Sequence, residues 1–480
     1  QGVTVSTYTP SPTRWRALAV LAAAQFLIIM DTSIIGVALP DMQQSLGFKP
    51  DALSWVFNAY VIAFGGLLLV GGKLSDIFGA RRIFTAGFWI LTGASLAAGL
   101  ARTPTFEIVA RAAQGVGAAL IAPSALTLVM TLFGHDHREL AKAMAFYGAA
   151  APAGGTAGVF LGGVLTEWLD WPWVFYVNLP VGIAVLAVAG RLLPGGARRP
   201  GKVDVVGGLT ITASLSLGVL AIVRAPELGW ASVETLISAA AALGLFALFV
   251  GIQAGRREPL LPLSIFRRPD LASANVVMAL LGAAWVPMWF FLNLYLQQEL
   301  NFGPFAAGSS LLPMTVLMMI VMVVATGPLV GRFGTKPMLV SGLVVLAVGL
   351  GTLAFVSANG SFVGDVLVGS LIAAFGMSLA YIPAIMTAMS GAAAGDAGLA
   401  SGIVNSTYQI GSALGLAVMT AVASSAGGDQ LGDLSALTDG YAAAFFGAGL
   451  IAVIAAVVAF ATIGRRRDAP STHDELTLVG

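Results

Sequence analysis

Runs of about 20 consecutive apolar residues recur along this chain of 480 residues and restrict what it can fold into. A helix of that length crosses the ~30 Å hydrocarbon core of a bilayer. Apolar residues make up 58 % of the chain and charged residues only 10 %, which is not the balance of a soluble domain. We predict an all-α membrane protein with fourteen spans, at residues 16–38, 52–71, 83–101, 105–131, 141–165, 172–193, 205–223, 233–253, 272–296, 305–330, 338–357, 362–389, 398–425 and 440–463.

The Lys and Arg residues indicate the direction of the spans, because cytoplasmic loops beside membrane helices carry an excess of basic residues. With the N-terminus in the cytoplasm, 20 of the 24 basic residues lie on that side, three lie outside and Arg111 lies within a span. We therefore expect a multi-pass protein of the cytoplasmic membrane with both termini, as short tails, in the cytoplasm. The basic residues follow this topology, so they give no reason to expect nucleic-acid binding.

Residues that hold metals, nucleotides or disulfides are scarce. The chain has no Cys, and its three His residues show no metal-ligand spacing. No GxxxxGK[ST] segment occurs, so a nucleotide-driven pump would need a separate subunit. We expect no cofactor, no metal and no enzymatic activity, and an ion gradient is the simpler source of energy.

Two pieces of the sequence repeat at nearly one offset. GKLSDIFGAR (72–81) aligns without gaps with GPLVGRFGTK (327–336), at an offset of 255, and Gly158 and Gly162 align with Gly411 and Gly415, at an offset of 253. Many transporters consist of repeated halves with the substrate site between them. We predict two six-helix bundles, at 14–193 and 271–463, with two inserted transmembrane helices and linkers at 194–270 and a tail at 464–480.

Four motifs carry a resemblance to a known family. They are MDTSIIGVALP (30–40), GGKLSDIFGARR (71–82), RAAQGVGAALIAPSAL (111–126) and WPWVFYVNLPVG (171–182). They are similar to the first-helix motif, the loop signature, the fourth-helix motif and the start of the sixth helix of the major facilitator superfamily, in its fourteen-helix drug:proton antiporter group. The resemblance covers about residues 14 to 465 and implies a bacterial exporter that works by alternating access as a monomer.

The chain also departs from the family pattern. GVFLGG (158–163) has Val159 where the antiporter motif usually has proline, which removes a backbone break and leaves open whether antiport is strict. Tyr408 stands where arginine is common, and Pro172 replaces a usual arginine between two tryptophans. The second half thus lacks one charge that the family often has.

Only Asp31 and Arg111 lie deep inside long apolar runs. At ~1.5 Å per residue, Asp31 lies ~13 Å and Arg111 ~10 Å below the outer ends of their spans, so the two can pair. Gln114 lies one turn from Arg111 and can complete a polar cluster, and Glu107 can relay protons or orient the arginine. We interpret these four residues as a proton-coupling site in which Asp31 changes its proton occupancy; the alternatives are a static ion pair and, for Glu107, an interfacial acid.

A second group is expected to control conformation, as the resemblance implies for the loop signature. Gly72 and Gly79 permit close backbone approach, Asp76 can accept hydrogen bonds, and Arg81 and Arg82 can pair across the two halves or serve only as positive-inside anchors. Close packing between the moving halves is the expected role of Gly158 and Gly162.

Aromatic residues with a few amides suit amphiphilic compounds of variable shape. The candidate substrate-binding residues are Asn58, Tyr60, Trp289, Asn293, Tyr295, Gln297, Asn405, Tyr408 and Gln409, although each can instead face other helices or lipid. We predict a proton-coupled exporter of lipophilic, in part cationic, drugs or small metabolites, whose partners are its substrate, protons and membrane lipids. Export of a lipid-like or endogenous secondary metabolite, and a transporter-derived sensor without turnover, are the alternatives.

Overall fold

The computed structural model describes residues 13–48, 55–195, 204–256, 259, 263, 269–358, 360–390, 397–428 and 433–464, whose secondary structure consists of helices joined by turns, with no strand. The predicted tail lies outside this part of the chain, except for residue 464. The elements are α1 (Arg14–Leu46), α3 (Trp55–Phe78), α4 (Ala80–Gly99), α5 (Pro104–Phe133), α6 (His137–Trp168), α7 (Trp173–Tyr176), α8 (Asn178–Leu192), α9 (Val205–Leu228), α10 (Val233–Gly255), α11 (Pro269–Leu294), η2 (Tyr295–Glu299), α12 (Pro304–Ser310), α13 (Leu312–Ile320), η3 (Val321–Thr326), α14 (Gly327–Phe333), α15 (Thr335–Leu353), η4 (Phe362–Leu367), α16 (Val368–Ser390), α17 (Ala397–Ser425) and α18 (Leu434–Thr462).

Every predicted span coincides with a helix or with a series of shorter helical segments. Within the described residues, 11 helices are long and apolar enough to cross a membrane. The all-α membrane fold is therefore confirmed, whereas the number of fourteen spans stays a prediction. The first helix runs beyond its predicted end and stops at Leu46, because Gly47 adopts a left-handed conformation (φ 71°) and its N–H bonds to the Gln43 carbonyl.

The internal repeat reappears in the backbone. Gly79 and Gly334, which the sequence alignment pairs, both have positive φ, 92° and 84°, and each directly precedes a helix, α4 and α15 respectively. Side chains rarely adopt this conformation, so both positions require glycine for the turn between two consecutive helices.

Gly158 and Gly162 of α6 and their repeat partners in α17 pack inside their own halves, so the prediction that Gly158 and Gly162 pack between the halves is wrong. A Cβ at Gly158 would lie 2.8 Å from the Met30 carbonyl oxygen of α1, and one at Gly162 would lie 2.9 Å from that of Ile34. Gly411 and Gly415 approach the backbone of α11 at Ala279 and Ala283 in the same way. The missing side chains let two backbones of one half approach closely.

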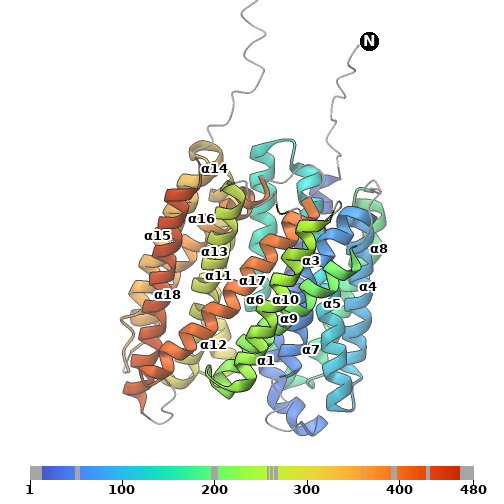
Figure 1. The fold of residues 1–480 in the computed structure, drawn as a ribbon. Helices are drawn as coiled ribbons and strands as arrows, with labels where there is room; N and C mark the ends of the chain where they lie inside the picture. Colours follow the sequence, from blue (N-terminus) through green and yellow to red (C-terminus); the bar gives the residue numbers. More distant parts are fainter. Residues whose placement is uncertain are drawn as a thin grey trace, which may run out of the picture.

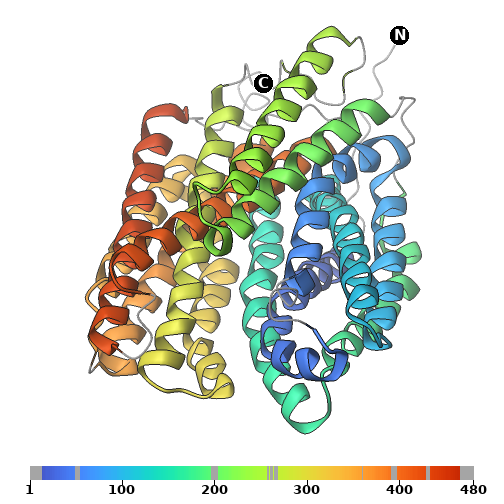
Figure 2. The same ribbon diagram turned by 60° about the horizontal axis from the view of Figure 1, so that its bottom comes forward.

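α9 and α10 lie across the boundary between the two halves of the chain (Figure 1). Figures 1 and 2 show α9 and α10, in green, crossing the boundary between the blue N-terminal helices and the yellow-to-red C-terminal helices. α9 contacts both α3 and α17, and α3 and α17 also contact each other. α9 therefore bridges the two halves, and α10 packs against α9.

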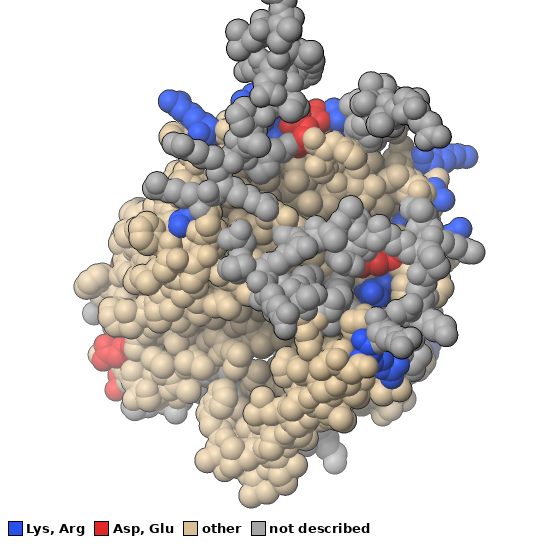
Figure 3. Space-filling model, turned by 45° about the horizontal axis from the view of Figure 1, so that its top comes forward, with Lys and Arg blue, Asp and Glu red and all other residues tan. Residues whose placement is uncertain are grey.

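One end of the molecule is rich in basic side chains, and we call it the basic end. Arg81, Arg138 and Arg332 lie there, at the start or end of their helices, and Figure 3 shows the Lys and Arg side chains gathered around this end. Asp204 lies at the same end, where it caps α9 through Gly207 N–H (2.9 Å), accepts from the Gln253 amide (2.9 Å) and pairs with Arg256 (3.4 Å). Burial raises the pKa of Asp204, but these three partners outweigh it and hold the pKa below its usual value.

Candidate functional site

The predicted pair of deep charges forms a buried ion pair between α1 and α5. Arg111 Nη1 donates to Asp31 Oδ2 at 2.8 Å, and both side chains are fully buried. Arg111 Nε donates to the Val56 carbonyl in the first turn of α3 (2.9 Å), and its guanidinium lies 4.6 Å from the centre of the Tyr60 ring. α3 thus positions the arginine through a backbone acceptor and an aromatic face.

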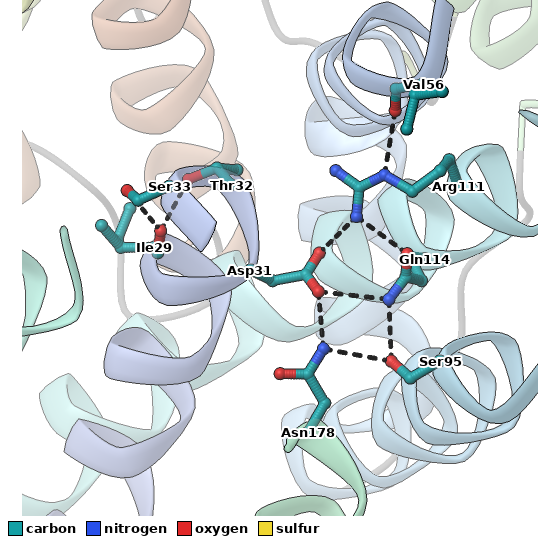
Figure 4. Close-up of polar contacts among 9 residues, drawn as sticks. All are labelled: Ile29, Asp31, Thr32, Ser33, Val56, Ser95, Arg111, Gln114 and Asn178. Carbon is teal, nitrogen blue, oxygen red and sulfur yellow. Dashed lines mark hydrogen bonds and ion pairs between the residues drawn. The ribbon is translucent and has the colours of Figure 1, made fainter. Parts of the chain in front are cut away.

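Neutral side chains complete the cluster (Figure 4). Gln114 accepts from Arg111 (2.8 Å) and donates to Asp31 Oδ1 (3.1 Å) and to the Ser95 hydroxyl of α4 (2.8 Å). Asn178, at the start of α8, donates to Asp31 Oδ1 (2.6 Å) and to Ser95 (3.3 Å). Four helices besides that of Asp31 therefore contribute to one network around its carboxylate.

The structure confirms that Asp31, Arg111 and Gln114 lie together. Asn178 and Ser95 were not among the predicted site residues, although Asn178 lies inside one of the quoted motifs, WPWVFYVNLPVG. Each is a fully buried polar residue in an apolar region, and such residues need hydrogen-bond partners. That requirement was the one available signal, and it does not by itself say which partner each residue has.

Part of the hydrogen-bonding capacity of this region is unused. Glu107, one turn before Arg111 on α5, is fully buried, and neither of its carboxylate oxygens has a hydrogen-bond partner. Arg111 Nη2 and Asn178 Oδ1 are likewise buried without a partner. If all ionise, Asp31, Glu107 and Arg111 carry a net charge of −1, which a single proton or a monovalent cation would neutralise.

The candidate substrate residues fall into separate groups. Asn58 and Tyr60 are buried in α3, where Tyr60 belongs to the surroundings of Arg111. Trp289 lies half-buried on α11. Gln297 of η2 donates to Asn293, near the end of α11 (2.9 Å). Tyr295 of η2 donates to the Ser357 carbonyl (2.7 Å). Half-buried positions of α17 are occupied by Asn405, Tyr408 and Gln409.

Residues absent from the prediction join the two halves near their middle. Tyr147 of α6 donates to Gln25 of α1 (2.9 Å), and the neighbouring Gly148 lies against Ile382 and Tyr381 of α16. Tyr381 in turn makes an edge contact with Tyr408 (5.8 Å between ring centres). The hydroxyls of Thr156 and Thr315 also hydrogen-bond across the halves. Tyr408 thus adjoins, through Tyr381, an aromatic and polar boundary between the halves.

Arg81 of the loop signature does not make the contact across the halves that the sequence allowed. Its Nη1 donates to the Gly190 and Leu193 carbonyls at the end of α8, both at 3.3 Å, so it binds inside the N-terminal half and does not pair across the halves. The physical reason is that unpaired carbonyls at a helix C-terminus attract a nearby cation. Gly72 is buried, Asp76 is half-buried and Arg82 is exposed.

Comparison with known proteins agrees with this architecture. The family model described as Major Facilitator Superfamily matches residues 21–416 and 274–478. The chain is 37 % identical to the cephamycin export protein CmcT of Amycolatopsis lactamdurans, covering 92 % of this chain and 91 % of that protein. It is 34 % identical to the puromycin resistance protein pur8 of Streptomyces alboniger, covering 96 % and 93 %.

Solved structures show the same fold at low sequence identity. The human organic anion transporter MFSD10 (TETRAN) superposes with a TM-score of 0.66 at 16 % identity, covering 94 % of this chain and all of that chain. The proton:xylose symporter XylE superposes with a TM-score of 0.66 at 13 % identity, covering 95 % and 97 %. With the family match over most of its length, the chain is a member of the Major Facilitator Superfamily, a family of multi-pass membrane transporters of small molecules.

Proposed function

We propose that the protein exports lipophilic small molecules, including cationic ones, in exchange for protons by alternating access. The observation that carries this proposal is the buried network around Asp31. A protonated Asp31 can no longer form an ion pair with Arg111, whereas its neutral partners can hydrogen-bond either form of the carboxyl group. The network therefore has two arrangements that differ by one proton, as a coupling site requires.

Glu107 supports the same role. A buried carboxylate without a partner is costly unless it is protonated or meets a cation. Its place one turn from Arg111 makes it the relay between the outer end of α5 and Asp31. Asp31 is itself fully buried here, so a proton reaches it only after the helices around it move.

The path for the cargo lies along the boundary between the halves in this proposal. Tyr147, Tyr381 and Tyr408 offer aromatic faces there, and Asn405 and Gln409 offer amides. Such a lining suits flat, amphiphilic compounds that differ in shape. Asp76 and the turn at Gly79 would control which side is open, and the basic end would face the cytoplasm.

An endogenous secondary metabolite is the second candidate cargo. Its support is that the relatives include a protein named for export of cephamycin and one named for puromycin resistance. A drug panel and a panel of metabolites can therefore be tested on the same protein.

Purified protein in liposomes under an imposed proton gradient tests the proposal. We expect gradient-driven movement of lipophilic dyes by the wild type and its loss in Asp31→Asn, with dye binding retained. Asp41→Asn is the matched control, because Asp41 is an exposed acid on the same helix. Full pH-dependent transport by Asp31→Asn would rule out the coupling role, and dye binding without flux in the wild type would indicate the sensor and refute export.

A further inference from the structure

A cavity of about 650 Å³ opens between the two halves at the basic end. Its residues on α6 lie in the first two turns of that helix, whereas α6 meets α1 beside Asp31 at Gly158. α6 contributes Arg138 and Lys142, and η3 and α14 contribute the remaining lining. The full lining is Arg138, Lys142, Val323, Val324, Gly327, Pro328, Gly331 and Arg332. Cations lie on both sides of the cavity.

Two glycines of α14 bring the walls together. The Cβ position of Gly327 lies 3.4 Å from Lys142 Cα, and that of Gly331 lies 3.6 Å from Arg138 Cγ. The two pairs are each one turn apart on their helices, so α6 and α14 run side by side over this distance. The cavity is therefore a property of the state in which these two helices are in contact.

The three cations have no acidic partner among the residues that the structure describes. The neighbouring acids of α6 are engaged elsewhere, since Glu139 pairs with Arg14 (2.6 Å) and Asp136 caps the N–H groups of Arg138 and Glu139. Lys142 lies over the ring of Trp15 and Arg332 over that of Phe333, each at 5.3 Å from the ring centre. These contacts use the charge but leave N–H donors available. The site is thus an uncompensated cluster of three positive charges.

Apolar surface continues from the cluster toward the middle of the bundle. Val324 of the cavity is 67 % exposed, and Phe146, one turn beyond Lys142 on α6, is 39 % exposed. A soluble anion would contact only the three cations. A lipid with an anionic headgroup and acyl chains would contact both the cations and the apolar surface.

We propose that this cavity binds an anionic phospholipid of the leaflet at the basic end. Arg138, Lys142 and Arg332 hold the phosphate, and the acyl chains lie along Val324 and Phe146. Because the ligand touches both halves, it stabilises the arrangement in which α6 and α14 meet, and the lipid becomes a regulator of the conformational cycle. The binding itself is independent of the cargo and of proton coupling, so it can fail while the proposed function holds.

Native mass spectrometry of the detergent-purified protein measures this binding with phosphatidylglycerol and with phosphatidylcholine of the same acyl chains. We expect phosphatidylglycerol to be retained in preference. Lys142→Gln with Arg332→Gln should weaken it about 30-fold, the equivalent of ~2 kcal/mol at about 1 kcal/mol per basic residue. The control, Arg16→Gln with Arg191→Gln, removes the same charge from exposed sites outside the cavity and should leave retention unchanged.

Val324→Trp keeps every charge and fills the apolar wall, so it tests the acyl contact even if the charge variant folds poorly. We expect it to lower phosphatidylglycerol retention severalfold. Equal retention of the two lipids, an unchanged affinity in both cavity variants, or displacement of the lipid by an equal concentration of inorganic phosphate would overturn the proposal.

Discussion

Removal of the Arg111 guanidinium should destabilise the protein far more than removal of a partly exposed arginine. Arg111→Gln deletes the ion pair to Asp31 and the bonds to Gln114 and the Val56 carbonyl. Asp31 then stays buried with only the neutral donors of Gln114 and Asn178. Breaking a buried pair from one side costs about 3 to 5 kcal/mol, and we expect the lower end because these two donors remain.

Unfolding by SDS in mixed micelles, followed by tryptophan fluorescence, measures the change in the free energy of unfolding. Arg14→Gln is the control, because it breaks an ion pair to Glu139 whose side chains are 15 % and 34 % exposed, and such pairs contribute about 1 kcal/mol or less. The double variant Asp31→Asn with Arg111→Gln contains neither charge of the pair, so its loss should be smaller than the sum of the single losses by about 0.5 to 3 kcal/mol. A loss for Arg111→Gln no larger than that for Arg14→Gln, or strict additivity in the double variant, would refute the reasoning.

Three further changes test the packing and the electrostatics in the same unfolding assay, with the liposome assay added for the transport of the Gly158 and Gly163 variants. Gly79→Ala should cost about 1 to 3 kcal/mol, because alanine is strained at φ 92°; an unchanged stability would contradict this. Gly158→Leu should separate α1 from α6 and abolish transport, whereas Gly163→Leu, where nothing lies within 4 Å of the Cβ position, should be tolerated; equal effects of the two would disprove the packing role. The folded-state pKa of Asp204 is lowered, so its contribution is present above the unfolded pKa of about 3.9 and is lost as the pH falls through the folded value; Asp204→Asn should be less stable at pH 7 and lack this acid-dependent loss, which a pH series of unfolding curves detects.

The prediction of the Asp31 network from sequence succeeded for Asp31, Arg111 and Gln114 and missed Ser95 and Asn178. A charge inside an apolar run is rare and needs a partner of opposite sign, and Arg111 was the only deep cation available to Asp31. Serine, threonine and asparagine occur in many helices of this chain and can hydrogen-bond to the backbone of their own helix. Thr32 and Ser33 both donate to the Ile29 carbonyl in this way (Figure 4). Ser95 and Asn178 could therefore be recognised only when their helices were placed around α1.

The glycine positions and Arg81 also show that the sequence did not identify which helix each residue contacts. Their spacing predicted helix faces that come close to a neighbour, which is correct, but the neighbour of α6 at Gly158 is α1 of the same half. From sequence, Arg81 could pair across the halves or serve only as a positive-inside anchor; the structure places it on the Gly190 and Leu193 carbonyls at the end of α8.

By itself, the sequence determined the all-α membrane class, the repeat and the deep ion pair, because these follow from the length of apolar runs, from self-similarity and from the cost of a charge in hydrocarbon. Tertiary structure alone decided which helices meet: the places of Asn178 and Ser95 in the Asp31 network, the aromatic boundary between the halves and the basic cavity at α6 and α14. Their residues lie far apart in the chain, and packing contacts between apolar helices leave no periodic signal that names the partner.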